Sequence, residues 1–250
     1  MNANGDSRVL LYDLEISPIL GWVYDMYEAN VLRVERPKHI MSFAYKWLGD
    51  EHTSVVSLPD FKRYKRDKFS DRDVVKVLRD LIDEADVVVA HNANGFDNKI
   101  AMARILSHGL TPPSPFVSVD TLITARRVFK FGANSLQFLC EQLGIGTKTQ
   151  VKHHDIWHLC LAGDKDAWAA MCEYNKQDVE LLEGLYYRLR PYMQNHPIVS
   201  LKGCPKCGSP NVQFRGTQRT RVATYHRIHC QDCGGWSRER KATPDRPQYS

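Results

Sequence analysis

The stretch Val9-Leu10-Leu11-Tyr12-Asp13-Leu14-Glu15 is an apolar run that ends in two carboxylates. Its apolar residues predict a buried strand, and positions two apart on a strand face the same side. Asp13 and Glu15 therefore point together from one face of that strand. An Asp-x-Glu pair taken alone is most often a solvated strand end, so its meaning depends on the rest of the chain.

Two further acids stand beside sequences that predict buried elements. Asp97 closes the stretch His91-Asn92-Ala93-Asn94-Gly95-Phe96-Asp97, which follows an apolar run over residues 87–90. Asp178 lies in a long predicted helix over residues 165–190. Asp97 alone could simply cap the next helix, but burying four carboxylates together is too costly without cations. Because carboxylates are ligands that Mg²⁺ and Mn²⁺ prefer, the sequence predicts a divalent-metal site.

Strand and helix patterns alternate over the first 190 residues. β-branched and aromatic residues predict strands near residues 21–27, 40–48, 54–58, 87–90 and 117–119. Apolar residues at helical spacing predict helices over residues 71–85, 98–108, 135–143 and 165–190. Ser70 or Asp71 is expected to cap the first of these helices. Early strands followed by alternating helices and strands indicate a mixed sheet covered by helices.

The composition is that of an ordinary globular protein, with 43% hydrophobic and 25% charged residues. The apolar stretches are shorter than a membrane span. The N-terminal residues have neither the basic segment nor the apolar segment of a secretory signal. We therefore expect no membrane association and a location in the cytoplasm.

Three motifs in one order carry a family resemblance. Tyr174 and Asp178 are four residues apart on the predicted helix and share one face. The motifs are Asp13-x-Glu15, Asn92-x3-Phe96-Asp97 and Tyr174-x3-Asp178. Together they resemble those of the DEDD superfamily of 3′–5′ exonucleases. The tyrosine is typical of the DEDDy branch, because the other branch has a histidine five residues before the aspartate and this chain has Glu173 there.

The resemblance covers residues 8–190 and implies a ribonuclease-H-like fold, with a mixed five-stranded sheet flanked by helices. It implies hydrolysis from the 3′ end that releases nucleoside 5′-monophosphates. Two Mg²⁺ or Mn²⁺ ions about 3.5–4 Å apart would activate water and neutralise the phosphate charge. Asp13 would bridge both ions, and Glu15 and Asp97 would complete their ligand sets. Asp178 would hold the ion that generates the nucleophile, and Tyr174 would orient the water.

Neighbouring residues of the second motif are candidate substrate contacts. Asn92 would orient Asp97 or contact the substrate. Phe96 would pack beneath the site or wedge against the terminal bases. His91 is expected to be a hydrogen-bonded residue at a strand end rather than a metal ligand.

Four of the seven cysteines form two pairs near the C-terminus, in Cys204-Pro205-Lys206-Cys207-Gly208 and Cys230-Gln231-Asp232-Cys233-Gly234. A two-residue gap lets both thiolates bind one ion, and the following glycine permits a tight turn. Four thiolates predict a structural Zn²⁺ site that resembles a zinc ribbon. Disulfides are the alternative, and a reducing compartment argues against them.

The basic charge is concentrated in the same segment. From Ser200 to the end there are 10 basic and 3 acidic residues, which give this segment a net charge of +7. The preceding part carries −2, so the whole chain carries +5. Apolar and basic residues alternate between the cysteine pairs, which predicts two strands with a basic face. The candidate nucleic-acid contacts are Arg215, Arg219, Arg221 and Arg227, with Phe214, Tyr225 and Trp236 for base stacking. Docking of a replication or repair protein is the alternative use.

The sequence therefore predicts an exonuclease domain over residues 1–190, a linker over 191–203 and a zinc ribbon with a basic tail over 204–250. The expected function is a metal-dependent 3′–5′ exonuclease, acting alone or as a proofreading subunit in trans. Its expected substrate is single-stranded or 3′-ended DNA, with RNA possible. A replication or repair role in a bacterium or a virus-infected host cell follows from the family. The alternatives are a non-catalytic nucleic-acid-binding protein on the same fold and a structure-specific endonuclease.

Overall fold

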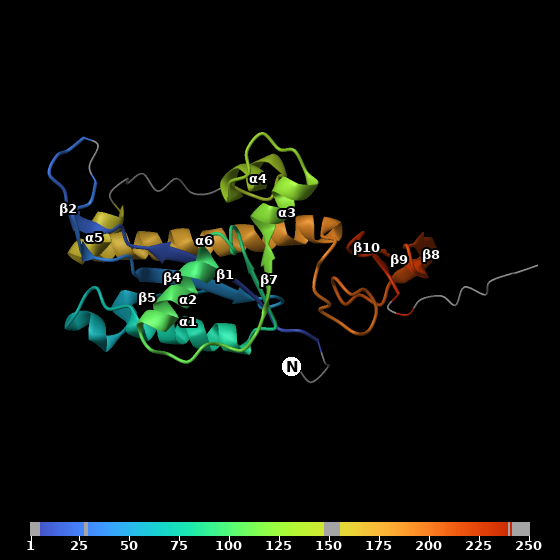
Figure 1. The fold of residues 1–250 in the computed structure, drawn as a ribbon, viewed down its shortest axis with the longest axis horizontal. Helices are drawn as coiled ribbons and strands as arrows, with labels where there is room; N and C mark the ends of the chain where they lie inside the picture. Colours follow the sequence, from blue (N-terminus) through green and yellow to red (C-terminus); the bar gives the residue numbers. More distant parts are fainter. Residues whose placement is uncertain (1–5, 28–29, 148–155, 240, 242–250) are drawn as a thin grey trace, which may run out of the picture.

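A computed structural model of the protein describes residues 6–27, 30–147, 156–239 and 241. Figure 1 shows a central sheet with helices on both sides and a smaller sheet at one end. The central sheet has the strand order β5-β4-β1-β6-β7. Its strands are β1 (Val9–Ile16), β4 (Ile40–Trp47), β5 (Ser54–Ser57), β6 (Val87–Ala90) and β7 (Val117–Asp120).

Strand β1 lies at the centre of this five-stranded sheet. It pairs antiparallel with β4 and parallel with β6. β5 extends the antiparallel side, and β7 extends the parallel side. The predicted fold class, a mixed five-stranded sheet flanked by helices, is therefore confirmed.

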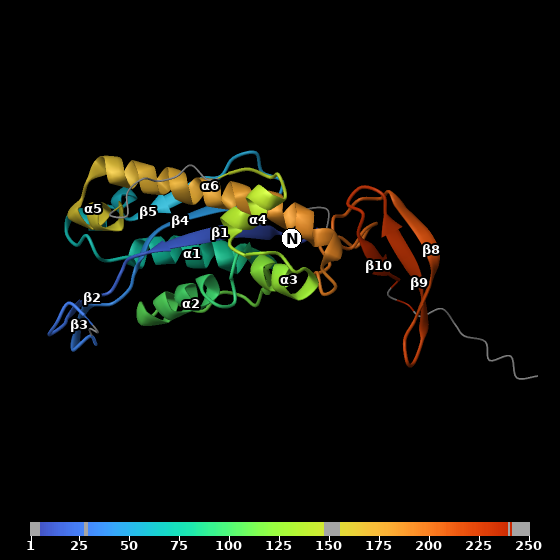
Figure 2. The same cartoon turned by 90° about the horizontal axis from the view of Figure 1, so that it is seen from above.

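Alternate residues of β1 enter two different cores. Leu10, Tyr12 and Leu14 pack in one core with residues of α1 (Arg72–Glu84) and α2 (Asp97–Ser107). Val9 and Leu11 pack in the other, with residues of α4 (Leu136–Gln142) and α6 (Lys165–Leu189). Figure 2 shows the sheet between α6 on one side and α1 and α2 on the other. Because side chains alternate along a strand, Asp13 and Glu15 share the face of β1 that α6 covers.

Most predicted elements lie where the patterns placed them, but two helices were not predicted. These are α3 (Thr121–Val128) and α5 (Ile156–Ala162). Short 3₁₀ turns also occur at Leu58–Asp60, Lys62–Lys65 and Arg190–Tyr192. Among the described residues, no helix combines the length and the apolar character needed to cross a membrane.

Asp71 does not cap α1 with its side chain, as the sequence suggested, although it occupies the N-cap position. Its buried carboxylate accepts two hydrogen bonds from Arg104, at 2.8 and 2.6 Å. It also accepts the Ile40 backbone N–H at 2.9 Å and lies 2.6 Å from His108 Nε2. Burial would raise the pKa of Asp71, but these donors lower it below its usual value. The carboxylate therefore joins α1 to α2 and β4, a tertiary role that a local capping pattern does not reveal.

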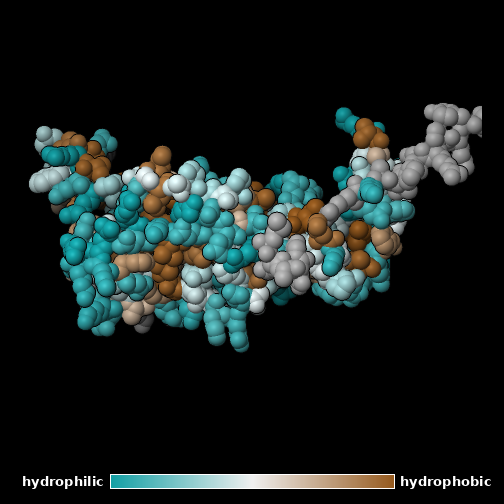
Figure 3. Space-filling model, turned by 90° about the horizontal axis from the view of Figure 1, so that it is seen from below, coloured by the Kyte–Doolittle hydropathy of each residue, from teal (hydrophilic) through white to brown (hydrophobic). Residues whose placement is uncertain are grey.

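A second hairpin, β2 (Leu20–Trp22) and β3 (Arg33–Arg36), follows β1 and projects from the body of the molecule (Figure 2). The strand predicted near residues 21–27 therefore ends at Trp22. Apolar side chains are visible on this hairpin in Figure 3, and Tyr24, Met26 and Tyr27 are more than four-fifths exposed. A long strand could not form here, because the segment turns into solvent and finds no sheet to extend.

The smaller sheet, at the end of α6, is formed by β8 (Val212–Arg219), β9 (Thr224–Cys230) and β10 (Trp236–Arg238) in the order β10-β9-β8. We call residues 204–239 the ribbon. It is attached to the larger domain by Lys206, which is buried and donates to the Pro191 carbonyl at 2.7 Å. The segment between the two is also held, because Val199 accepts from the Ser7 N–H and donates to the Pro205 carbonyl.

Candidate functional site

The acids predicted from three separate motifs meet between β1 and α6. Oxygen atoms of Asp13, Glu15 and Asp178 lie within 4.8 Å of one another. Glu15 and Asp178 are buried, and Asp13 is half-buried. The strand places its two carboxylates on the face that α6 covers, and the helix turns Asp178 toward them.

Asn175 fixes the position of Asp13, a role that the sequence did not indicate. This fully buried amide donates to Asp13 Oδ2 at 2.9 Å and to the Asp13 carbonyl at 3.2 Å. Its own oxygen accepts from Ser42 Oγ on β4 at 3.2 Å. The amide therefore ties α6 to β1 and β4 at the acid cluster. The sequence did contain a sign that Asn175 is buried, since it lies four residues after Met171 and four before Val179, on the buried side of α6.

Glu15 is oriented by a helix that was not predicted. Trp157, on α5, donates its indole N–H to Glu15 Oε2 at 3.2 Å. The indole packs against the buried core of the five-stranded sheet. The carboxylate therefore has a donor held in place by packing.

Asp97 is buried beside β1 but outside the close group of three. Its Oδ1 accepts the Leu14 N–H at 3.3 Å, three residues along β1 from Leu11, which pairs with Val89 of β6. The pKa of Asp97 is raised to about 7, mainly by burial and in part by the charge of Asp120, while its own N–H and that of Leu14 act in the opposite direction. An acid in this position favours a nearby cation, because a positive charge would lower its pKa toward the ordinary value.

The turn that carries the second motif is held by Asp120, at the end of β7. Its carboxylate accepts the N–H groups of Asn92 at 3.1 Å and Asn94 at 3.0 Å. It also caps α3 by accepting from Leu122 and Ile123. Asn92 itself has a φ of 75°, a left-handed conformation that asparagine tolerates better than most residues. Asp120 of the neighbouring strand β7 thus holds the turn in place, and this positions Asp97 at the start of α2.

The remaining predicted residues lie around this site. Asp97 is the first residue of α2, so it is not the cap of that helix. Phe96 precedes it and is half-buried. Tyr174 is half-buried one helical turn before Asp178. His91 is hydrogen-bonded to Thr121 Oγ1 and to the Asn134 carbonyl, both at 2.9 Å, which agrees with a structural role.

The acid cluster fits a divalent cation. Carboxylate oxygens from a strand and a helix converge on one point, and the surrounding amide and indole groups orient them. Hard oxygen ligands of this kind suit Mg²⁺ and Mn²⁺. Without a cation, the like charges would repel one another in a poorly solvated place.

The four ribbon cysteines form a second candidate metal site. Their sulfur atoms lie within 4.8 Å of one another. Cys204 Sγ is 3.8 Å from Cys233 Sγ, and Cys207 Sγ is 3.6 Å from Cys230 Sγ. All four are free thiols, and these separations exceed the roughly 2.05 Å of a disulfide. The arrangement suits a tetrahedral Cys₄ zinc site.

The two knuckles have the tight turns that the sequence predicted. Gly208 and Gly234 adopt φ values of 79° and 72°, and their N–H groups donate to Cys204 and Cys230 respectively. Burial would raise the pKa of Cys230, but the N–H groups of Cys233 and Asp232 lower it to about 7. These N–H groups favour the thiolate form that binds a metal.

The predicted basic residues of the ribbon do not share one face. Gln213, His229 and Trp236 are neighbours across the sheet, as are Phe214, Ile228 and Ser237. Because adjacent residues of a strand face opposite sides, Phe214 lies on the face away from Trp236. By the same register, Arg227 lies with Trp236 and Arg219 lies on the opposite face. The single basic face expected from the sequence is therefore wrong.

Comparisons with known proteins agree with this fold and site. Residues 62–156 match the protein-family model described as Exonuclease. This range includes the second motif with Asp97, whereas Asp13, Glu15 and Asp178 lie outside it. A comparison with curated protein sequences found no significant match.

A solved structure, the family B DNA polymerase of the hyperthermophilic archaeon Pyrobaculum calidifontis, superposes with a TM-score of 0.54 at 18% identity. The superposition covers 80% of this chain and 26% of that polymerase, so this chain spans about a quarter of the polymerase's length. This similarity supports the fold. The family match confirms the predicted resemblance to exonucleases for residues 62–156.

Proposed function

We propose that this protein is a metal-dependent 3′–5′ exonuclease that shortens nucleic acid, with DNA favoured, and releases nucleoside 5′-monophosphates. The observation that carries the proposal is the convergence of Asp13, Glu15 and Asp178, with ligand atoms within 4.8 Å, beside a buried Asp97. The match of residues 62–156 to an exonuclease family supports the same reading.

The four acids would hold Mg²⁺ or Mn²⁺ ions. Bound there, two such ions would supply an activated water and would neutralise charge on the scissile phosphate and the leaving oxygen. The protein contributes fixed ligand positions, because Asn175 orients Asp13 and Trp157 orients Glu15. Tyr174 is proposed to position the attacking water through its hydroxyl. Its ordinary pKa of about 10 makes a tyrosine a weak base at neutral pH, so positioning is its suitable role.

Asn92 and Phe96 are proposed to contact the substrate. Both belong to the turn that Asp120 holds against the end of β6, so they lie next to Asp97. Phe96 is half-buried and leaves part of its ring accessible. A partly exposed ring at this place can stack on or wedge against a terminal base, while Asn92 offers an amide to the sugar or phosphate.

The ribbon is proposed to hold one structural Zn²⁺ through Cys204, Cys207, Cys230 and Cys233. The four free thiols within 4.8 Å support this assignment. A structural zinc site supplies folding free energy directly. The division into an exonuclease domain (1–190), a linker (191–203) and a zinc ribbon (204–250) remains our proposal.

The test is the cleavage of a 5′-labelled single strand in the presence of Mg²⁺ or Mn²⁺. We expect a ladder of products that shortens from the 3′ end and is lost in Asp13→Ala and Asp178→Ala. The matched control is Glu180→Ala, which removes an exposed carboxylate from the same helix and should leave the ladder unchanged. Loss of activity in Glu180→Ala, with activity retained in Asp13→Ala and Asp178→Ala, would contradict the assignment of the site.

Two other outcomes would favour the alternatives. A single internal cut, also lost in Asp178→Ala, would indicate a structure-specific endonuclease. Tight binding of the labelled strand without any cleavage by a metal-loaded protein would indicate a nucleic-acid-binding protein that has lost catalysis. Product analysis adds a further check, because the proposal requires nucleoside 5′-monophosphates.

A further inference from the structure

One face of the ribbon carries a row of aromatic rings and guanidinium groups in contact with one another. His229 and Trp236 stack with ring centroids 4.5 Å apart and planes inclined by 26°. The guanidinium carbon of Arg227 lies 5.5 Å from the centre of the Trp236 ring. That of Arg238 lies 4.2 Å from the centre of the Tyr225 ring. Strand register places these five residues on the same face, so we call them the aromatic–arginine face.

The face opens into a groove between the ribbon and the segment that follows α6. This groove has a volume of about 880 Å³ and is lined by Arg227, Trp236 and Arg238, among others. Its lining includes four basic residues and one acidic residue: Lys206, Arg227, Arg238 and Lys241, and Glu239. The excess of cations gives the groove a charge that complements a phosphodiester backbone.

Trp236 also lines a second groove, which leads toward the larger domain. That groove has a volume of about 810 Å³ and is bordered by Tyr187 and Arg188 at the end of α6 and by Arg190 in the 3₁₀ turn that follows. Tyr187 and Tyr192 supply further partly exposed rings. Arg188 lies ten residues after Asp178 on one helix, hence about 15 Å along its axis. The two grooves therefore form a continuous path, lined by basic and aromatic residues, from the ribbon toward the helix that carries Asp178.

We propose that the aromatic–arginine face and the two grooves that meet at Trp236 bind single-stranded nucleic acid. Unpaired bases would stack on Trp236 and Tyr225, and the arginines would contact phosphates. Stacking favours single strands because bases in a duplex have no free face, and it tolerates many sequences. The path gives the ribbon a use in holding the strand whose end reaches the acid cluster.

The electrostatics of the ribbon favour nucleic acid over an apolar protein surface. Its guanidinium groups lie over ring faces, and because Arg227 and Arg238 are exposed, they can contact phosphate. Asp232, a ribbon carboxylate that lines the second groove, already accepts hydrogen bonds from Ser209 and Asn211. By contrast, the exposed hairpin β2–β3 presents apolar side chains such as Tyr24, Met26 and Tyr27 to solvent.

The test is the binding of a fluorescent oligothymidylate of about 16 nucleotides, long enough to occupy both grooves. Binding is measured by anisotropy with the full-length, zinc-loaded protein carrying Asp13→Ala, so that no cleavage is required. Trp236→Ala should weaken binding by about 5- to 150-fold. Arg238→Ala should weaken it and reduce the magnitude of the salt dependence by about 0.7, as expected for one lost phosphate contact on a single strand.

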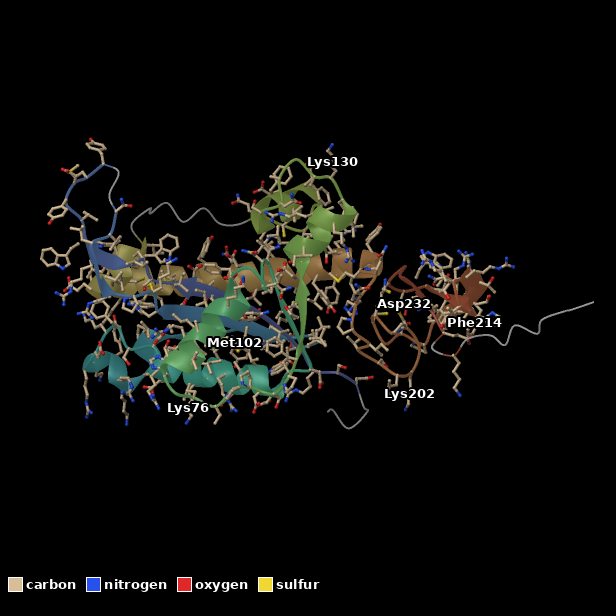
Figure 4. All side chains as sticks on the ribbon, viewed as in Figure 1. Lys76, Met102, Lys130, Lys202, Phe214 and Asp232 are labelled. Atoms are coloured by element: carbon tan, nitrogen blue, oxygen red, sulfur yellow. The ribbon has the colours of Figure 1, made fainter. Side chains whose placement is uncertain are left out.

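The matched controls are Phe214→Ala and Arg219→Ala, which remove an exposed ring and an arginine from the opposite face (Phe214 is labelled in Figure 4). They should leave the affinity unchanged, and all variants should retain zinc. Equal losses on both faces, or no loss in Trp236→Ala, would overturn the proposal, as would a duplex of the same length that competes equally well. These binding results do not depend on cleavage, so a failure of the proposed exonuclease activity would be seen separately.

Discussion

The two sheets of this protein differ in what holds them together. All side chains of β1 in the five-stranded sheet are buried or half-buried, and its apolar residues enter two cores. In the ribbon, seven of the eight residues of β8 are exposed, and the buried residues include Cys204 and Cys230. The larger sheet is therefore stabilised by apolar burial, whereas the ribbon has four converging thiols in place of a core.

This difference reverses the relation between metal and fold. In the larger domain the fold assembles the acid cluster, because amide, indole and backbone groups position the carboxylates. In the ribbon the proposed zinc site would assemble the fold, since few apolar contacts would remain if the thiolates separated. Removing metal should thus inactivate one region and unfold the other.

The largest expected effect is the removal of zinc. A Cys₄ site contributes an apparent binding free energy of about 10–16 kcal/mol that a small ribbon cannot replace. We expect Cys204→Ser to release zinc and to lose amide-exchange protection in β8–β10, while β1, β4 and β6 stay protected. The measurements are zinc content and hydrogen exchange, with Cys172→Ser, outside the cluster, as control. Unfolding of the five-stranded sheet in the same variant would show that the two sheets do not differ in their dependence on zinc.

Two phenylalanines, one in each sheet, test whether apolar burial stabilises the larger sheet and not the ribbon. Phe43, on β4, is completely buried, whereas Phe214, on β8, is 62% exposed. Phe43→Ala should reduce the free energy of unfolding of the larger domain by about 3–5 kcal/mol, because it creates a cavity. Phe214→Ala should cost less than about 1 kcal/mol. Denaturant titration measures both, and similar values for the two variants would contradict the assignment of the core.

Acid titration probes the buried ion pair of the larger domain. The pKa of Asp71 is lowered in the folded state, so its contribution to stability is present above the unfolded value of about 3.9 and is lost as the pH falls through the folded value. Asp71→Asn should cost about 3–5 kcal/mol at pH 7, because Arg104 loses its charged partner, and less near pH 3. Urea unfolding at both pH values measures the difference.

The control for this pair is Asp73→Asn, which removes the half-buried partner of the exposed Arg63. A pair at the surface of this kind contributes at most about 1 kcal/mol. An equal loss in both variants, or a loss in Asp71→Asn that persists unchanged at low pH, would show that the buried pair does not act through its charge.

The smallest expected effect concerns the ligand-holding amide. Asn175→Ala should raise the Mg²⁺ or Mn²⁺ concentration needed for half-maximal nuclease activity by about 10- to 100-fold, as expected for loss of a group that orients a metal ligand. Asn175→Ala should also lower thermal stability, because it removes a buried side chain that ties α6 to β1 and β4, so the metal requirement is measured at a temperature where the variant is folded. Asn195→Ala, an exposed amide outside the site, is the control. An unaltered metal requirement in Asn175→Ala would remove this residue from the site.

Local patterns predicted most strands and helices of the larger domain, but they failed where a neighbour decides the structure. The helix α3 begins at a cap formed by Asp120, which also binds the turn at Asn92 and Asn94. The segment after Trp22 has aromatic and β-branched residues typical of a strand, yet it lies on a projecting hairpin. Propensity is overridden in both places by what lies alongside.

The sequence alone determined the ligand types and their local spacing. The acids of the three motifs, the cysteine knuckles and the glycines that follow them depend on spacings of two to four residues, which short-range geometry sets. Only the tertiary structure decided which groups hold those ligands and which ribbon arginines share a face. Asn175 and Asp13 are 162 residues apart, and Trp157 and Glu15 are 142 apart, so their hydrogen bonds exist only once the helices pack on the sheet. Spacing along a chain fixes direction within one element, but the contact between elements is fixed by packing.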